Sequence, residues 1–300
     1  MSAASRKPWR DWAADSMIRA LFWILFRLSY PRRVAIMGQI MRGIGPLIGY
    51  RARAEDQLVY IFPSMPIAKR REVVRDVLDN FGRTLIENYS TTDQLRWAQS
   101  WQPNGPGWEI CEKARKDGRP ILFISGHFGN YQAARAAMNV RGYKMGGLYR
   151  PMNNPYLNNH YIASVEGVGG GAFARDRKGL AQFVKTLRNG GQGAMLIDQY
   201  FAGGEPLDFL GQPAPTALSA GEIALKYKTL LIPIYAERMS NGIDFHVWVE
   251  APVPHTDART MTQALNDSLT ARVRHSPGQW LWVHRRWKPW RHPQPPQGIH

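Results

Sequence analysis

Apolar runs of strand length alternate with helical patterns along much of this chain, and this alternation constrains the fold more than any other feature. "PILFIS" is followed by "NYQAARAAMNV", and "MGGLYR" is followed by "NNPYLNNHYIASV". Apolar runs of five or six residues predict buried strands, whereas spacings of three and four predict helices. Repeated strand–helix order predicts an α/β fold with a mainly parallel sheet flanked by helices.

The same order continues toward the C-terminus. "QGAMLID" and "LLIPIYAE" read as buried strands on either side of a helix, "TALSAGEIALKYK". "GIDFHVWVE" alternates apolar and polar residues, as a more exposed strand does, and a helix is expected over residues 257–275.

The N-terminal region is apolar in a different way. Residues 16–30 are rich in aromatic side chains, but Arg19 and Arg27 interrupt them. The uninterrupted run is shorter than the ~20 residues that a spanning helix needs. Aromatic rings flanked by Arg are typical of helices that lie at a membrane interface. We therefore expect membrane-associated helices over residues 1–50, a catalytic domain over 51–290 and a disordered tail over 291–300.

Charge and cysteine content limit the function classes. The chain has 39 Lys and Arg against 23 Asp and Glu, a net charge of +16, which favours polyanions such as nucleic acid, an anionic membrane or a phosphorylated substrate. The single cysteine, Cys111, excludes an internal disulfide and a cysteine-built zinc or iron–sulfur site. No P-loop, HExxH or GxSxG motif occurs, so neither a metal nor a nucleotide cofactor is expected.

The C-terminal stretch "QWLWVHRRWK" mixes Trp with cationic residues. This mixture would suit a membrane interface or a docking face for an acidic protein. Single-stranded nucleic-acid binders use a similar mixture, but no nucleic-acid-binding motif is present, so we expect no nucleic acid partner.

One histidine lies where a strand-like run ends and a helical pattern begins. Gly126 and Gly129 flank His127 and allow a tight turn, and Asn130 is a suitable residue to cap the helix that follows. The imidazole then lies near the positive end of a helix, which favours its neutral, basic form. His127 and Gln132 can meet only if His127 lies in the loop before the helix, because five helical residues would turn them roughly 140° apart.

The motif "HFGNYQ" resembles the catalytic motif of the bacterial late lauroyl/myristoyl acyltransferases that complete lipid A, in which an acidic residue ends the motif. Six further blocks occur in that family's order, among them "YRPMNNPYLN", "RDRKGL", "LIDQ" and "QWLWVHRRWK". The resemblance implies a glycerolipid-acyltransferase-like fold and transfer of a fatty acyl chain from acyl carrier protein to a hydroxyl of a membrane lipid, most directly a lipid A precursor. It also implies a location at the cytoplasmic face of the bacterial inner membrane.

The resemblance further implies that His127 is the general base and that the residue at position 132 orients it. Here that residue is Gln132, which can accept a hydrogen bond but cannot offset the charge of an imidazolium. In a catalytic triad the comparable change costs about 10⁴ in rate. Three alternatives stay open: Gln132 is a neutral orienting group, a carboxylate such as Asp198 replaces it, or the activity has been lost and the protein only binds lipid or carrier. A family enzyme with another acceptor, such as a lyso-aminolipid or glycolipid, is a further alternative.

Other family-like blocks supply candidate substrate-binding residues, namely Arg150, Arg175, Lys178, Asp198 and Arg238. Arg150 is expected to bind a phosphate, and Arg175 and Lys178 precede or open a helix where an anion is favoured. Asp198 is expected at the carboxyl end of a strand, where it shapes the pocket.

Overall fold

The computed structural model describes residues 8–152 and 154–288. Its strands are β1 (Pro103–Asn104), β2 (Ile121–Ser125), β3 (Met145–Tyr149), β4 (Ala172–Ala174), β5 (Gln192–Leu196), β6 (Glu205–Phe209), β7 (Gln212–Thr216), β8 (Leu230–Arg238) and β9 (Phe245–Val249). Its helices are α1 (Pro8–Leu25), α2 (Tyr30–Ile44), α3 (Tyr50–Ile61), α4 (Ile67–Asn88), α5 (Thr91–Ala98), α6 (Trp108–Lys116), α7 (Tyr131–Asn139), α8 (Pro155–Gly167), α9 (Arg177–Arg188), α10 (Ser219–Tyr227), α11 (Ala258–His275) and the short 3₁₀ helix η1 (Pro277–Gln279).

A seven-stranded sheet organises the molecule, with the strand order β1-β9-β8-β2-β5-β3-β4. Neighbouring strands are parallel except for β8 and β9, which are antiparallel. The predicted α/β class and mainly parallel sheet are therefore confirmed. A separate antiparallel hairpin of β6 and β7 lies beside α11 and was not predicted, because its strands contain Pro206, Pro213 and Pro215.

Helices cover both faces of the sheet. One face packs apolar side chains of β2 and β8 against α6 and α7, and the other packs them against α9, α10 and α11. Leu122 and Ile124 point to the second face, whereas Ile121 and Phe123 point to the first, as the two-residue repeat of a strand requires. All four side chains are at most 1% exposed, which explains why this run lacks polar residues.

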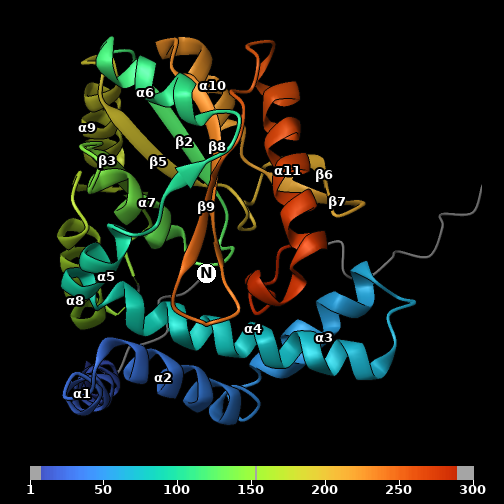
Figure 1. The fold of residues 1–300 in the computed structure, drawn as a ribbon. Helices are drawn as coiled ribbons and strands as arrows, with labels where there is room; N and C mark the ends of the chain where they lie inside the picture. Colours follow the sequence, from blue (N-terminus) through green and yellow to red (C-terminus); the bar gives the residue numbers. More distant parts are fainter. Residues whose placement is uncertain (1–7, 153, 289–300) are drawn as a thin grey trace, which may run out of the picture.

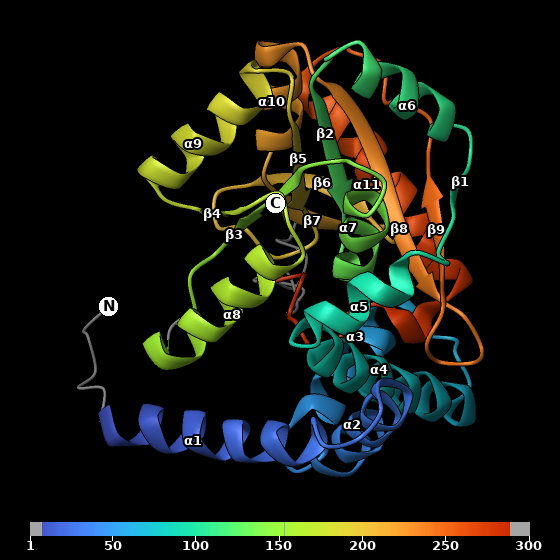
Figure 2. The ribbon, with the colours of Figure 1, turned by 60° about the vertical axis from the view of Figure 1, so that its left-hand side comes forward.

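The helices α1 to α4 form a layer across one end of the sheet (Figure 1 and Figure 2). Asn80 and Thr84 of α4 both donate hydrogen bonds to the backbone oxygen of Gly129, just beyond the carboxyl end of β2. Helix α4 is long and amphipathic, and it buries Val73, Val74, Val77 and Leu78. The N-terminal helical layer therefore lies beside the end of the sheet where His127 is found.

The C-terminal stretch differs from its predicted role. Trp280, Trp282 and Trp287 are at most 2% exposed and form one core with apolar side chains of α2, α3 and α4. Arg286 is fully buried as well, and its guanidinium donates to the backbone oxygen of Pro215. The prediction that these aromatic rings form a membrane interface or docking face is wrong, because packing against the N-terminal helices removes them from solvent.

Helix α1 instead carries the three most exposed tryptophans among the described residues. Trp9, Trp12 and Trp23 are 61%, 59% and 63% exposed, and Met17 of the same helix is 75% exposed. Among the described residues, no helix combines the length and the apolar content needed to cross a bilayer. The disordered tail predicted for residues 291–300 lies outside the described residues.

Candidate active site

Four neighbouring strands, in the order β2-β5-β3-β4, end at the same edge of the sheet. His127 follows β2, Asp198 follows β5, Arg150 follows β3 and Arg175 follows β4. Their common placement agrees with the rule that open α/β sheets bind ligands at the carboxyl ends of their strands.

The turn that holds His127 depends on two glycines. Gly129 has a φ of +53°, and a Cβ at this position would lie 1.8 Å from the backbone oxygen of Ala236. Gly126 lets the chain pass close to Asp198, since a Cβ there would lie 3.1 Å from the Asp198 carboxylate. Asn130 then caps α7 by accepting hydrogen bonds from the backbone N–H groups of Gln132 and Ala133, so the predicted loop and helix start are confirmed.

Asp198 contacts His127 twice. Its Oδ2 accepts the backbone N–H of His127 at 2.7 Å, and its Oδ1 lies 2.8 Å from Nδ1 of the ring. Burial alone would raise the pKa of Asp198, but the charge of His127 and the hydrogen bonds from His127 and Trp280 hold that pKa at about 2. An ionised carboxylate only accepts hydrogen bonds, so Nδ1 carries a proton, and in the neutral ring Nε2 presents a free lone pair.

Residues from the C-terminal stretch hold this carboxylate in place. Trp280 Nε1 donates to Asp198 Oδ2 at 2.8 Å, and both side chains are buried. His284 Nε2 accepts the backbone N–H of Tyr200 at 3.1 Å and so fixes the loop that follows Asp198. Burial lowers the pKa of His284 to about 4, which keeps its ring neutral and able to accept that hydrogen bond.

Gln132 makes a different contact from the one expected. Its Oε1 accepts a hydrogen bond from Nη1 of Arg135 at 2.6 Å, while Asp198 takes the Nδ1 position on His127. Of the three alternatives drawn from the sequence, this geometry corresponds to the one in which Asp198 supplies the carboxylate. The physical reason is that Asp198 reaches the ring from the neighbouring strand β5, whereas Arg135, one turn further along α7, draws the amide oxygen of Gln132 away.

The other ring nitrogen of His127 faces outward. The side chain of His127 is 20% exposed, and Nε2 lies 3.5 Å from Nε2 of Gln199. The Gln199 amide N–H can donate only weakly at this distance. An incoming hydroxyl group can therefore replace the amide at Nε2 and leave the amide free to bind a nearby oxygen.

The predicted cationic residues occupy distinct positions. Arg150 and Arg175 are exposed beyond the paired ends of β3 and β4, where Tyr149 lies opposite Ala174. The guanidinium of Arg175 also packs over the ring of Phe201, 5.3 Å from its centroid. Both residues therefore follow strands that end at the same edge of the sheet as the strand before His127.

Lys178 and Arg238 fit their predicted roles less well. Lys178 is exposed on the first turn of α9, but the carboxylate of Asp176 already caps this helix by accepting the N–H of Gly179. Arg238 is buried and donates to Glu87 at 2.5 Å and 2.7 Å. Its contacts join β8 to α4, which is a structural role away from solvent.

Trp280, Gln199 and His284 were not predicted as site residues. Gln199 directly follows Asp198 in the family-like block "LIDQ", so its position could have indicated it. Nothing in the local sequence separates Trp280 from the other tryptophans around it. Among the residues that the structure describes, no group of His, Cys, Asp and Glu side chains could hold a metal ion.

The model of one protein family, described as bacterial lipid A biosynthesis acyltransferase, matches residues 4–289. The chain belongs to this family. It is similar to a lipid A biosynthesis acyltransferase of Haemophilus influenzae, with 22% identity over 92% of this chain and 86% of the relative. It is also similar to a lipid A biosynthesis lauroyltransferase of Escherichia coli, with 23% identity over 93% of this chain and 92% of the relative.

Membership identifies the protein as an acyltransferase and confirms the resemblance that its motifs indicated. In this lipid A biosynthesis family member, the residue that ends the "HFGNYQ" motif is an amide, and the carboxylate beside His127 comes from Asp198.

Proposed function

We propose that this acyltransferase moves a fatty acyl chain from the thioester of acyl carrier protein to a hydroxyl of a membrane lipid, most directly a lipid A precursor. His127 is the general base and Asp198 its partner. The observation that carries this proposal is the buried Asp198 carboxylate on Nδ1, which leaves Nε2 of a partly exposed ring as a proton acceptor.

The reaction needs one proton acceptor and no covalent enzyme intermediate. The lipid hydroxyl gives its proton to Nε2 of His127 while its oxygen attacks the thioester carbonyl carbon. The carbon–sulfur bond then breaks, and the imidazolium returns the proton to the carrier thiolate. Asp198 stabilises the imidazolium between these steps through its hydrogen bond of 2.8 Å.

Gln199 is suited to stabilise the oxyanion of the intermediate. Its side-chain amide lies 3.5 Å from the base nitrogen, in the loop directly after Asp198. When the acceptor hydroxyl occupies Nε2, the amide N–H can turn to the carbonyl oxygen. A single donor of this kind typically contributes a factor of about 10² to 10³ in rate.

The surface around the site supports a membrane-bound acceptor and an anionic substrate. Exposed Trp12 and Trp23 of α1 provide rings for the membrane interface, and Arg19 of the same helix is exposed for lipid phosphates. Arg150 and Arg175 are positioned to bind phosphate on the acceptor or on the carrier's prosthetic group. This arrangement corresponds to a protein at the cytoplasmic face of the inner membrane, where an acidic acyl carrier would meet its net positive charge.

The test is acyl transfer by the purified protein in detergent, with acyl-carrier thioesters as donors. Lipid A precursors, a lyso-aminolipid and a lysophospholipid are offered as separate acceptors. His127→Ala is expected to lower the rate at least about 10²-fold, whereas the control His246→Ala, an exposed histidine on β9, leaves it unchanged. Absence of transfer by the unaltered protein to every acceptor would refute the proposal and support a lipid- or carrier-binding role.

A further inference from the structure

A groove of about 510 Å³ lies between helices α1 and α8, next to the end of α4. The two helices are neighbours (Figure 2), and near their N-terminal ends Asn154 Nδ2 donates to the backbone oxygen of Asp11 at 2.9 Å. Most of the side chains that line the groove are apolar, among them Ile18, Phe22, Trp23, Phe26, Tyr89 and Leu157. A volume of this size, with an apolar lining and a few polar groups, is typical of a ligand site.

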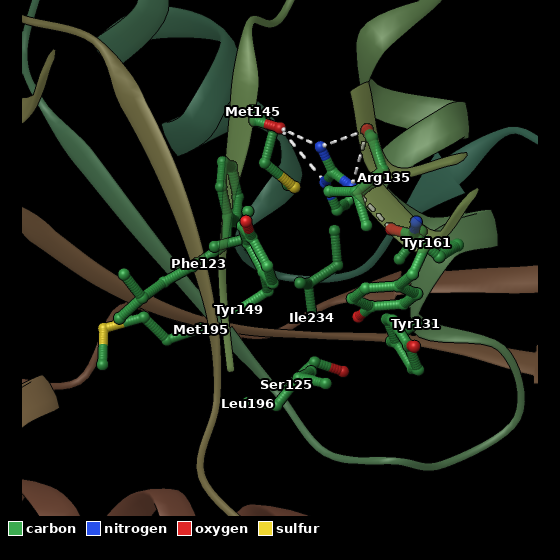
Figure 3. A pocket seen from close by; sticks show the side chains of 16 residues that line it. Phe123, Ser125, Tyr131, Arg135, Met145, Tyr149, Tyr161, Met195, Leu196 and Ile234 are labelled. Carbon is green, nitrogen blue, oxygen red and sulfur yellow. Dashed lines mark hydrogen bonds between the residues drawn. The ribbon is translucent and has the colours of Figure 1, made fainter. Parts of the chain in front are cut away.

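This groove is separate from the narrow pocket that lies between the sheet and the helices α7 and α8 (Figure 3). No residue lines both of them. Leu157 and His160 of α8 face the groove, whereas Tyr161 and Val165 of the same helix face the pocket. A ligand in the groove would therefore pack on a helix that also forms one wall of the pocket.

One buried acidic side chain lines the groove with an oxygen that has no hydrogen-bond partner. Asp15 is 3% exposed, and its Oδ1 accepts no hydrogen bond among the described residues. Nε2 of His160 lies 3.8 Å from this oxygen, and Nη1 of Arg19 lies 3.9 Å from Oδ2, so both are beyond hydrogen-bond distance. A buried carboxylate without a donor is costly, and the groove therefore favours a ligand that brings a positively charged donor.

Groups that bind an anion lie beside this carboxylate. Arg19 and His160 line the same groove, and their side chains are 65% and 45% exposed. Both therefore remain open to an anion such as a phosphate. The groove thus combines an acceptor for a cation, donors for an anion and an apolar wall, and a zwitterionic lipid carries all three complementary groups.

We propose that this groove binds a phospholipid whose headgroup carries a primary ammonium, of the phosphatidylethanolamine type. The ammonium donates to Asp15, the phosphate accepts from Arg19 and His160, and an acyl chain lies on the apolar wall. The bilayer is the source of this lipid, because α1 also carries the exposed tryptophans suited to a membrane interface. The inference concerns a second lipid site and does not depend on acyl transfer at His127.

The test measures binding of diheptanoyl phospholipids to the purified protein in a neutral detergent, by isothermal titration calorimetry. Three headgroups are compared: ethanolamine, choline, which keeps the positive charge but has no N–H donor, and glycerol, which has no cation. The unaltered protein is expected to bind the ethanolamine lipid at least about tenfold more tightly than the other two. Asp15→Asn keeps the shape of the side chain but removes its charge and should abolish this preference. Asp11→Asn, the same change on the same helix outside the groove, is the matched control and should keep it.

Several outcomes would overturn the inference. Equal binding of the three lipids, or no binding at all, would mean that the groove does not select an ammonium headgroup. Tightest binding of the glycerol lipid would mean that the net positive charge of the protein selects the headgroup. A preference that persists in Asp15→Asn would place the ammonium elsewhere. Arg19→Gln should weaken the binding of all three lipids, because each carries the phosphate, and unchanged affinities in this variant would refute the placement of the phosphate.

Discussion

Replacing Asp198 with Asn is the most direct test of the pair at the centre of the site. Oδ2 of the carboxylate accepts two donors, the backbone N–H of His127 at 2.7 Å and Trp280 Nε1 at 2.8 Å, whereas Oδ1 faces only Nδ1 of His127. The oxygen of the introduced amide is therefore held at the Oδ2 position. Its NH₂ group must then point at Nδ1, which can accept that hydrogen bond only by giving up its proton.

The consequence is a change of tautomer that blocks the base. With the proton moved to Nε2, His127 cannot take a proton from the acceptor hydroxyl. The same tautomer change in a serine protease triad lowers the rate about 10⁴-fold. At 1.36 kcal/mol per factor of ten, this corresponds to about 5 kcal/mol of activation free energy. We expect a loss of this order in Asp198→Asn.

Initial rates of acyl transfer at saturating acceptor measure this loss, and nitrogen-15 NMR of the His127 ring reports its tautomer directly. The control is Asp267→Asn, an exposed carboxylate on α11, which should retain full activity. Thermal unfolding of each variant checks that the fold is intact. A folded Asp198→Asn protein with a rate within tenfold of the unaltered one would refute the assignment of Asp198 as the partner of His127.

Three other changes test parts of the structure outside the catalytic pair. Burial lowers the pKa of His284 from 6.5 to about 4, so the unfolded chain takes up a proton first, and the free energy of unfolding falls by roughly 3 kcal/mol between pH 6.5 and pH 4. The drop in melting temperature from pH 7 to pH 4 should therefore be smaller for His284→Gln than for the unaltered protein, and an equal drop would contradict this. Arg238→Met leaves the buried charge of Glu87 unpaired and should lower the free energy of unfolding, measured in urea, by about 3 to 5 kcal/mol. A decrease of less than about 1 kcal/mol would argue against a structural ion pair. Trp23→Ser should weaken binding to anionic vesicles about tenfold. The control Ile110→Ser, which changes an exposed apolar residue on α6, should not weaken binding, and equal losses in the two variants would rule out α1 as the membrane face.

The sequence predicted those features that depend on local pattern. Alternation of apolar runs predicted the α/β class, the strand before His127 and the helix capped by Asn130, because these features follow from residues close together in the chain. The N-terminal helical layer was recognised too. The hairpin of β6 and β7 was missed because proline-containing strands do not show a two-residue pattern.

The partner of His127 could not be chosen from local pattern alone. Spacing pointed to Gln132, five residues away, and Asp198 stayed an alternative 71 residues away until the adjacent pairing of β2 and β5 brought it to the ring. Packing likewise decided which C-terminal tryptophans are buried, since Trp280 lies in a core that the N-terminal helices share with Phe209 of β6. Sequence by itself determined the fold class and singled out His127 as the candidate base, because both lie in local patterns. Tertiary structure alone decided which carboxylate serves that base and which aromatic residues meet solvent, because both depend on contacts between segments far apart in the chain.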